Sequence, residues 1–106
     1  MRTDADRARD MLEAVSRIEA RTSGGKAAFT SDEMLQVWVF HHLEILGEAA
    51  KGLSEGFRES RPGPPWRAVA RMRDRLAHGY WDVDLDAVWQ VVKRDPPGLE
   101  VALAPD

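Results

Sequence analysis

The chain has 106 residues, 43% of them hydrophobic and 31% charged, and its formal net charge is −3. A chain of this length can bury one core, but it is too short to join a cofactor domain to a substrate domain. The absence of cysteine excludes disulfides, thiolate metal sites and a cysteine nucleophile, and no apolar run approaches the ~18 residues of a membrane span. We therefore expect a single domain over residues 1–106. Because the charged N-terminus lacks the apolar stretch of a signal peptide, we also expect a cytoplasmic protein.

The first half of the chain predicts two amphipathic helices. Apolar residues recur at three-to-four spacing over residues 5–22, and Ser23-Gly24-Gly25 is expected to end that helix. A capping box over Thr30-Ser31-Asp32-Glu33, with Phe29 as its hydrophobic staple, is expected to start a long helix that runs to about Ser54. Apolar side chains cover more than half of the circumference of this long helix. We expect it to be central in the fold or shared with a partner chain.

The second half predicts a loop followed by more helices. Glycine and proline concentrate in residues 56–65, which we interpret as a connecting loop. Pro65 suits the first turn of a third helix that begins at Trp66 and ends at about His78, where Gly79 stops it.

The last predicted helix begins at Asp82 or Asp84, either of which can cap it. Its apolar side is formed by Leu85, Val88, Trp89 and Val92. We expect Asp95-Pro96-Pro97-Gly98 to interrupt this helix, and we expect a short helical piece through Leu99, Val101 and Leu103. No segment has a convincing strand period. The sequence therefore predicts an all-α fold, a four-to-five helix up-and-down bundle.

Positive charge is concentrated in one short segment despite the acidic total. Residues 58–75 carry six arginines and no lysine, against Glu59 and Asp74. A planar guanidinium suits bidentate binding of phosphate, so this segment is a candidate for contact with nucleic acid. An exposed basic helix face is the alternative interpretation.

Three polar side chains of catalytic type surround the predicted end of the third helix: Arg73, His78 and Tyr80. Arg73 can hold a phosphate and stabilise charge that develops on it. A histidine at a helix C-terminus lies near the negative end of the helix dipole, which favours the protonated imidazole. Five residues along a helix rotate the side chain by a net ~140° and advance it by ~7.5 Å, so Arg73 and His78 do not point the same way. We expect a substrate to lie across the helix end, or in a cleft that a second copy of the helix completes. His78 as a cap of its own helix is the alternative.

With its flanks, this motif resembles the HepT-like HEPN family. The resemblance is carried by the Arg-x4-His-x-Tyr motif together with four other pieces: Leu43-Glu44-Ile45-Leu46-Gly47-Glu48-Ala49-Ala50-Lys51, Pro65-Trp66-Arg67-Ala68-Val69-Ala70, Val88-Trp89, and the Asp95-Pro96 break. Proteins of this family are the toxins of type II toxin–antitoxin modules, in which the antitoxin is a minimal nucleotidyltransferase.

The resemblance implies a metal-independent endoribonuclease that acts as a homodimer. The motifs of both chains would line one cleft at the two-fold axis. By this resemblance, the RNA 2′-OH would attack the phosphate there, His78 would serve as base or acid, and Arg73 would supply positive charge. The family also implies that Asp74 orients Arg73 or His78. It further implies that the antitoxin attaches AMP to Tyr80, which blocks the cleft.

Several neighbouring residues are candidates for supporting roles. Arg67, Arg71 and Arg75 are expected to position phosphates or to bind the antitoxin, and Trp81 is a candidate neighbour of the substrate. Glu48 is expected near the cleft because the family's Gly-Glu-Ala segment packs against the motif helix, where Gly47 would permit a close approach.

His41, Glu44 and Glu48 share one helix face, a pattern that builds metal sites in some bundles. No second set of such residues accompanies it, so we expect no metal and no cofactor.

Two other functions remain open at this point. One is a HEPN subunit without catalytic activity that binds a nucleotidyltransferase or a nucleotide. The other is a structural dimerisation bundle, which would leave the clustered arginines unexplained.

Overall fold

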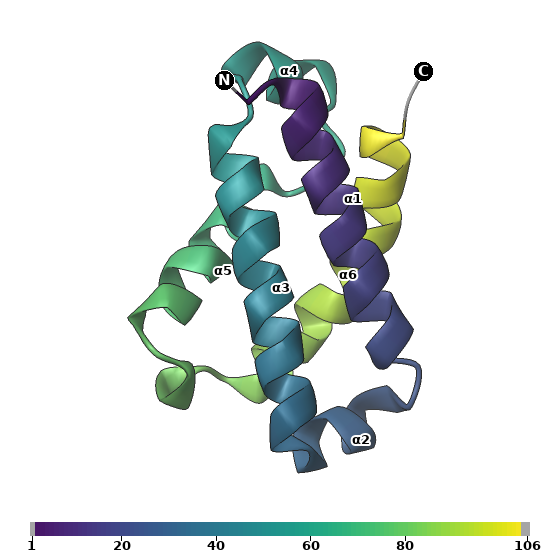
Figure 1. The fold of residues 1–106 in the computed structure, drawn as a ribbon, viewed down its shortest axis with the longest axis vertical. Helices are drawn as coiled ribbons and strands as arrows, with labels where there is room; N and C mark the ends of the chain where they lie inside the picture. Colours follow the sequence, from purple (N-terminus) through teal and green to yellow (C-terminus); the bar gives the residue numbers. More distant parts are fainter. Residues whose placement is uncertain (1, 105–106) are drawn as a thin grey trace.

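The computed structural model describes residues 2–104, except for the side chain of Trp81, and these residues form helices and no strand (Figure 1). The elements are α1 (Asp4–Arg21), α2 (Gly25–Ser31), α3 (Glu33–Gly52), α4 (Glu55–Ser60), α5 (Trp66–His78), the 3₁₀ turn η1 (Tyr80–Asp82) and α6 (Leu85–Leu103). The predicted all-α class is confirmed. The four long helices are the expected bundle, whereas the short helices α2 and α4 were not predicted.

Helix α3 is the centre of the fold. It packs against α1 on one side and α5 on the other, and α6 packs against α1 (Figure 1). This position explains its broad apolar surface, and it confirms the expectation of a central helix. The largest fully buried side chains come from five different helices: Met11, Val15, Ile18, Phe29, Val39, Leu46, Leu76, Val88 and Leu99.

The predicted capping box at Thr30 is wrong. Asp32 is the N-cap of α3 and its carboxylate accepts a hydrogen bond from the Leu35 amide at 3.2 Å. Thr30 lies inside α2, where its hydroxyl donates to the Lys26 carbonyl. Phe29 is no staple either, because its ring is fully buried against the ring of Trp89, with 5.4 Å between centroids. This buried ring belongs to helix α2, which the sequence did not predict.

The predicted loop over residues 56–65 is too long, because α4 occupies its first half. The Ser54 hydroxyl caps α4 by accepting from the Phe57 amide at 3.2 Å. Ser54 also donates its amide and its hydroxyl to the Asp4 carboxylate, at 2.8 and 2.6 Å. Ser54 therefore lies in the connection between α3 and α4 and not at the end of α3. Its hydrogen bonds attach this connection to the start of α1.

Helix α5 matches its predicted span from Trp66 to His78. Pro65 stands at its N-cap, one residue before the first helical position expected for it. Gly79 ends the helix with φ of 145°, a backbone conformation that side chains with a Cβ rarely adopt.

The predicted break at Asp95-Pro96-Pro97-Gly98 is wrong, because α6 continues through both prolines to Leu103. Each proline lacks the N–H that a helical hydrogen bond requires. The continuous helix nevertheless keeps one buried stripe on the inner side of α6, with spacings of four, seven and four residues. This stripe consists of Val88, Val92, Leu99 and Leu103. Its burial accounts for a helix that local propensity disfavours.

Within residues 2–104, none of the helices combines the length and the apolar character that crossing a bilayer requires.

Helices α3 and α5 approach each other closely at Gly47. A Cβ atom added to Gly47 would overlap with the Cβ of Arg73 and would lie 2.9 Å from the Val69 carbonyl oxygen. The backbone of α5 therefore occupies the space that a side chain would need. This contact brings the α3 segment around Gly47 directly against Arg73.

We predict that Gly47→Ala destabilises the fold by about 1–3 kcal/mol, because the added methyl group forces the two helices apart. The control is Gly98→Ala, which places the same methyl group on α6 with no atom within 4 Å of it. That control should be neutral or stabilising by up to about 1 kcal/mol. Urea denaturation followed by circular dichroism measures both variants. Equal free energies of unfolding for the two would contradict the close approach.

Candidate active site

Arg73 lies on α5 with its guanidinium between two carboxylates. Its Nε lies 2.9 Å from Glu48 Oε2 in an ion pair, and its Nη1 donates to Asp74 at 3.3 Å. Glu48 follows Gly47 on α3, so the close approach of α3 and α5 places this ion pair. Among the described residues, Nη2 of Arg73 has no hydrogen-bond partner, and one third of the side chain is exposed. The guanidinium is therefore held in one orientation while one edge can still bind a phosphate oxygen.

Asp74 is held by two cations. Lys51 donates to its carboxylate at 2.9 Å, and Arg73 donates to the same oxygen. The hydrogen bond from Lys51, followed by the one from Arg73, keeps the pKa of Asp74 below its ordinary value. Asp74 thus stays ionised and contacts Arg73, whereas the structure records no hydrogen bond between Asp74 and His78.

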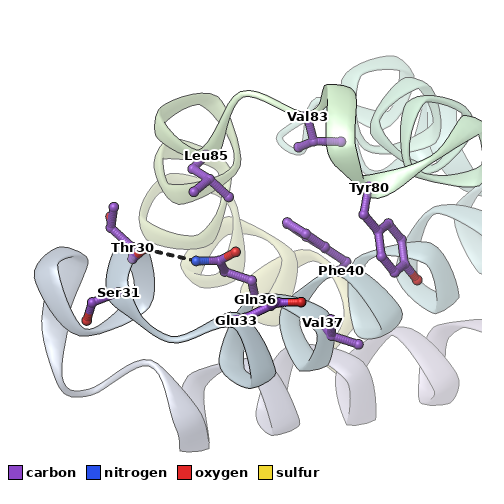
Figure 2. Close-up of a pocket in the computed structure, with 9 residues that line it drawn as sticks. All are labelled: Thr30, Ser31, Glu33, Gln36, Val37, Phe40, Tyr80, Val83 and Leu85. Atoms are coloured by element: carbon purple, nitrogen blue, oxygen red, sulfur yellow. Dashed lines mark hydrogen bonds between the residues drawn. The ribbon is translucent and has the colours of Figure 1, made fainter.

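Tyr80 lies just beyond the end of α5, and its hydroxyl donates to Glu44 Oε1 at 2.6 Å. Its ring packs against Phe40 with 4.9 Å between centroids. Tyr80 borders one end of a cavity of about 520 Å³ between α3 and the segment that follows α5, as Figure 2 shows. The hydrogen bond to Glu44, with partial burial of the ring, raises the pKa of Tyr80 to about 12.

His78 is exposed at the last residue of α5. It lines a cavity of about 310 Å³ with Arg75 and Asp82. Arg73 lines a different cavity of about 510 Å³, together with Glu44 and Glu48. Within one chain, Arg73 and His78 therefore line different cavities. This separation agrees with the helical spacing of the motif, which points the two side chains in different directions.

The arginines of residues 58–75 do not line one common cavity. Arg58, Arg67 and Arg71 line a groove of about 590 Å³ at the start of α5, and Arg75 lines the His78 cavity. Arg61 donates to the Ala102 carbonyl at 2.9 Å and so connects the loop before α5 to the end of α6. The side chain of Trp81 lies outside the described part of the structure.

Glu44 is the site residue that the sequence did not reveal. On the sequence it was one member of the His41, Glu44 and Glu48 face. In the structure, Glu44 contacts Tyr80 and Glu48 contacts Arg73. Within residues 2–104, these three side chains do not gather as a group that could hold a metal ion. Only the tertiary placement of the segment after α5 reveals the role of Glu44, because 36 residues separate it from Tyr80.

Comparison with known proteins gives one consistent family. The sequence matches the family described as "Ribonuclease HepT-like" over residues 11–104, which includes α3, α5 and the whole motif. A protein of Thermococcus cleftensis named "Probable ribonuclease HepT" is 40% identical over 100 residues, which cover 93% of this chain and 91% of that protein.

Two further relatives are similar over shorter shares of their length. A Methanocaldococcus jannaschii protein named as a gamma-glutamylcyclotransferase and "putative RNase" is 41% identical over 91 residues, covering 85% of this chain and 41% of its own. A Caldanaerobacter subterraneus protein named "Putative RNase" is 39% identical over 72 residues, covering 68% of this chain and 64% of its own. No solved structure matches this chain.

We predict that Glu44→Gln lowers the pKa of Tyr80 from about 12 toward its ordinary value near 10, because an amide does not stabilise the neutral phenol as a carboxylate does. Tyr80 is the single tyrosine of the chain, so the ultraviolet absorbance of tyrosinate reports on it alone. Circular dichroism at each pH verifies that the helices persist. The control is Glu33→Gln, which changes a residue that lines the Tyr80 cavity and should leave the pKa as it is. A wild-type phenol that ionises near pH 10 while the protein is still helical would contradict the contact.

Proposed function

Because the chain belongs to the HepT-like ribonuclease family, we propose that it is a metal-independent endoribonuclease whose active site combines Arg73 and His78 of two chains. The observation that carries this proposal is the arrangement of Arg73. Glu48 fixes its guanidinium from α3, and an edge remains for an anion. An arginine that is already oriented by its neighbours is preorganised to bind an anion at its remaining edge.

The proposed reaction uses the nucleophile that RNA carries. The 2′-oxygen attacks the adjacent phosphorus, the bond from phosphorus to the 5′-oxygen breaks, and a 2′,3′-cyclic phosphate forms. One His78 accepts the 2′-OH proton, and a second His78, from the other chain, protonates the leaving 5′-oxygen. Arg73 stabilises the negative charge that develops on the phosphate. Asp74 and Glu48 position Arg73 for this role.

A homodimer supplies the second histidine, and an exposed stripe on α3 is a candidate surface for it. Met34, Val37 and Ile45 share one face of α3 and are 82%, 43% and 37% exposed. Val37 borders the Tyr80 cavity, and Ile45 borders the Arg73 cavity. Pairing two chains along this stripe would cover apolar surface and bring the motifs together.

The regulatory part of the proposal concerns Tyr80. We propose that the chain is the toxin of a toxin–antitoxin module and that a nucleotidyltransferase antitoxin attaches AMP to Tyr80. Glu44 supports this placement, because it contacts the Tyr80 hydroxyl and also lines the Arg73 cavity. An AMP group on that hydroxyl would add bulk and negative charge where the RNA phosphate must bind.

One observation favours a second candidate function. Arg73 is neutralised by two carboxylates, and its cavity does not contain His78. A HEPN subunit that binds a nucleotidyltransferase partner or a nucleotide, and cleaves nothing, would fit this arrangement of a single chain. The nuclease assay below separates the two functions.

We predict that the purified protein cleaves RNA in EDTA. His78→Ala should reduce the rate by about 10²–10⁴, because proton transfer is lost, and Arg73→Ala by about 10²–10³, because charge stabilisation is lost. Arg9→Ala, which removes an exposed arginine of α1 outside the motif, is the control and should cleave normally. Cleavage that persists in both motif variants, or that stops with chelator, would rule out this mechanism. Wild-type protein that cleaves no RNA would favour the second candidate function.

We predict that dilution of wild-type chains with His78→Ala chains reveals a shared site. After equal mixing and subunit exchange, random pairing leaves about one quarter of the dimers with two histidines, so activity should fall to about a quarter. A site contained within one chain would retain about half of the activity under the same mixing. The measurement is the initial cleavage rate across a series of mixing ratios, with size-exclusion chromatography to verify the dimer.

A further inference from the structure

The hydroxyl of Tyr80 is held by a carboxylate that has no other partner in the described residues. Glu44 Oε1 accepts from Tyr80 Oη at 2.6 Å, and the Phe40 ring fixes the phenol ring in place. Residues 2–104 offer Glu44 no salt bridge, whereas Glu48, one turn further along α3, is occupied by Arg73. Glu44 is therefore the carboxylate in position to take a proton from Tyr80.

We propose that Glu44 is the general base for transfer of a nucleotide to Tyr80, so that this chain supplies part of the catalysis of its own modification. The inference rests on the proposed function, because it requires Tyr80 to be the acceptor. It adds a catalytic group on the acceptor side of the reaction, where otherwise the transferase alone would supply one.

The step is an in-line displacement on a nucleoside triphosphate that the transferase holds with its divalent cation. A bond forms between Tyr80 Oη and the α-phosphorus, and the bond from that phosphorus to the bridging oxygen of the β-phosphate breaks. Pyrophosphate leaves with the electron pair of the broken bond. The phenolic proton passes along the existing hydrogen bond to Glu44 Oε1, which becomes a neutral carboxyl group.

A base is needed because the phenol ionises so little by itself. With a pKa of about 12, only about one Tyr80 in 10⁵ is a phenolate at pH 7. The carboxylate that causes this stabilises the neutral phenol in the ground state. As the new bond to phosphorus forms, the phenolic oxygen loses electron density and its proton becomes acidic enough to move to Glu44.

The new phosphodiester also lies beside the proposed ribonuclease site. Glu44 lines the cavity that contains Arg73 and Glu48. The modified tyrosine can then place its phosphate near Arg73, the group that the RNA phosphate requires.

The test uses the full chain with a minimal nucleotidyltransferase of the proposed antitoxin class, saturating MgATP, and mass spectrometry of the intact chain. At pH 7, Glu44→Gln should be modified about 10²–10⁴ times more slowly than wild type. Gln can still accept the Tyr80 hydrogen bond but cannot take its proton. Glu33→Gln, which lines the cavity of Tyr80 without bonding to it, is the matched control and should be modified at the wild-type rate.

The pH dependence separates a base from a group that only holds the ring. The ratio of the Glu44→Gln rate to the wild-type rate should rise by about tenfold per pH unit from 7 to 9, because the variant depends on free phenolate. Glu44→Asp keeps a carboxylate, so its ratio should stay flat. A Glu44→Gln rate equal to wild type, or a ratio that does not change with pH, would overturn the role of Glu44. Wild-type protein that gains no AMP mass, or Tyr80→Phe that gains it, would overturn Tyr80 as the acceptor and the inference with it.

Discussion

The site depends on one contact, the approach of α3 to α5 at Gly47. Because glycine has no Cβ, the α5 backbone can lie against α3 at the level of Arg73. The residue after Gly47 then meets the guanidinium of Arg73, and Glu44, one turn earlier, meets the hydroxyl of Tyr80 beyond the end of α5. Two carboxylates on one helix therefore position two motif residues that come from another part of the chain. The positions of the Arg73 and Tyr80 side chains therefore depend on the packing of α3 against α5, and the motif sequence alone does not determine them.

The same geometry explains why the proposed ribonuclease site requires a second chain. The helix that carries Arg73 and His78 turns them toward different cavities, so their separation in space follows from their spacing in sequence. In the proposed homodimer, a two-fold axis would unite them. The carboxylates around Arg73 also lower the positive potential of the proposed site. RNA that binds there would compete with Glu48 and Asp74 for the guanidinium, or use the edge that they leave free.

The features that the sequence predicted depend on local signals, whereas those that it missed depend on contacts between distant residues. The spans of α1 and α5 and the central place of α3 follow from amphipathic periodicity and from glycine and proline signals, which act over a few residues. Helix α2 and the unbroken α6 accompany the burial of Phe29 and of Leu99 against other helices, and burial of that kind outweighs local propensity. The motif could be recognised in the sequence from its residue types and their spacing. The hydrogen bond between Glu44 and Tyr80 could not be predicted, because it joins residues far apart in sequence.

The central claim is that two chains share one ribonuclease site. The most direct measurement is a crystal structure of the protein with a short RNA whose 2′-oxygen is methylated at the cleavage position, so that attack is blocked. A shared site predicts a two-fold dimer in which one phosphate contacts Arg73 and lies within hydrogen-bond distance of His78 from both chains. RNA bound only in the groove of Arg58, Arg67 and Arg71, or bound by His78 of a single chain, would contradict it.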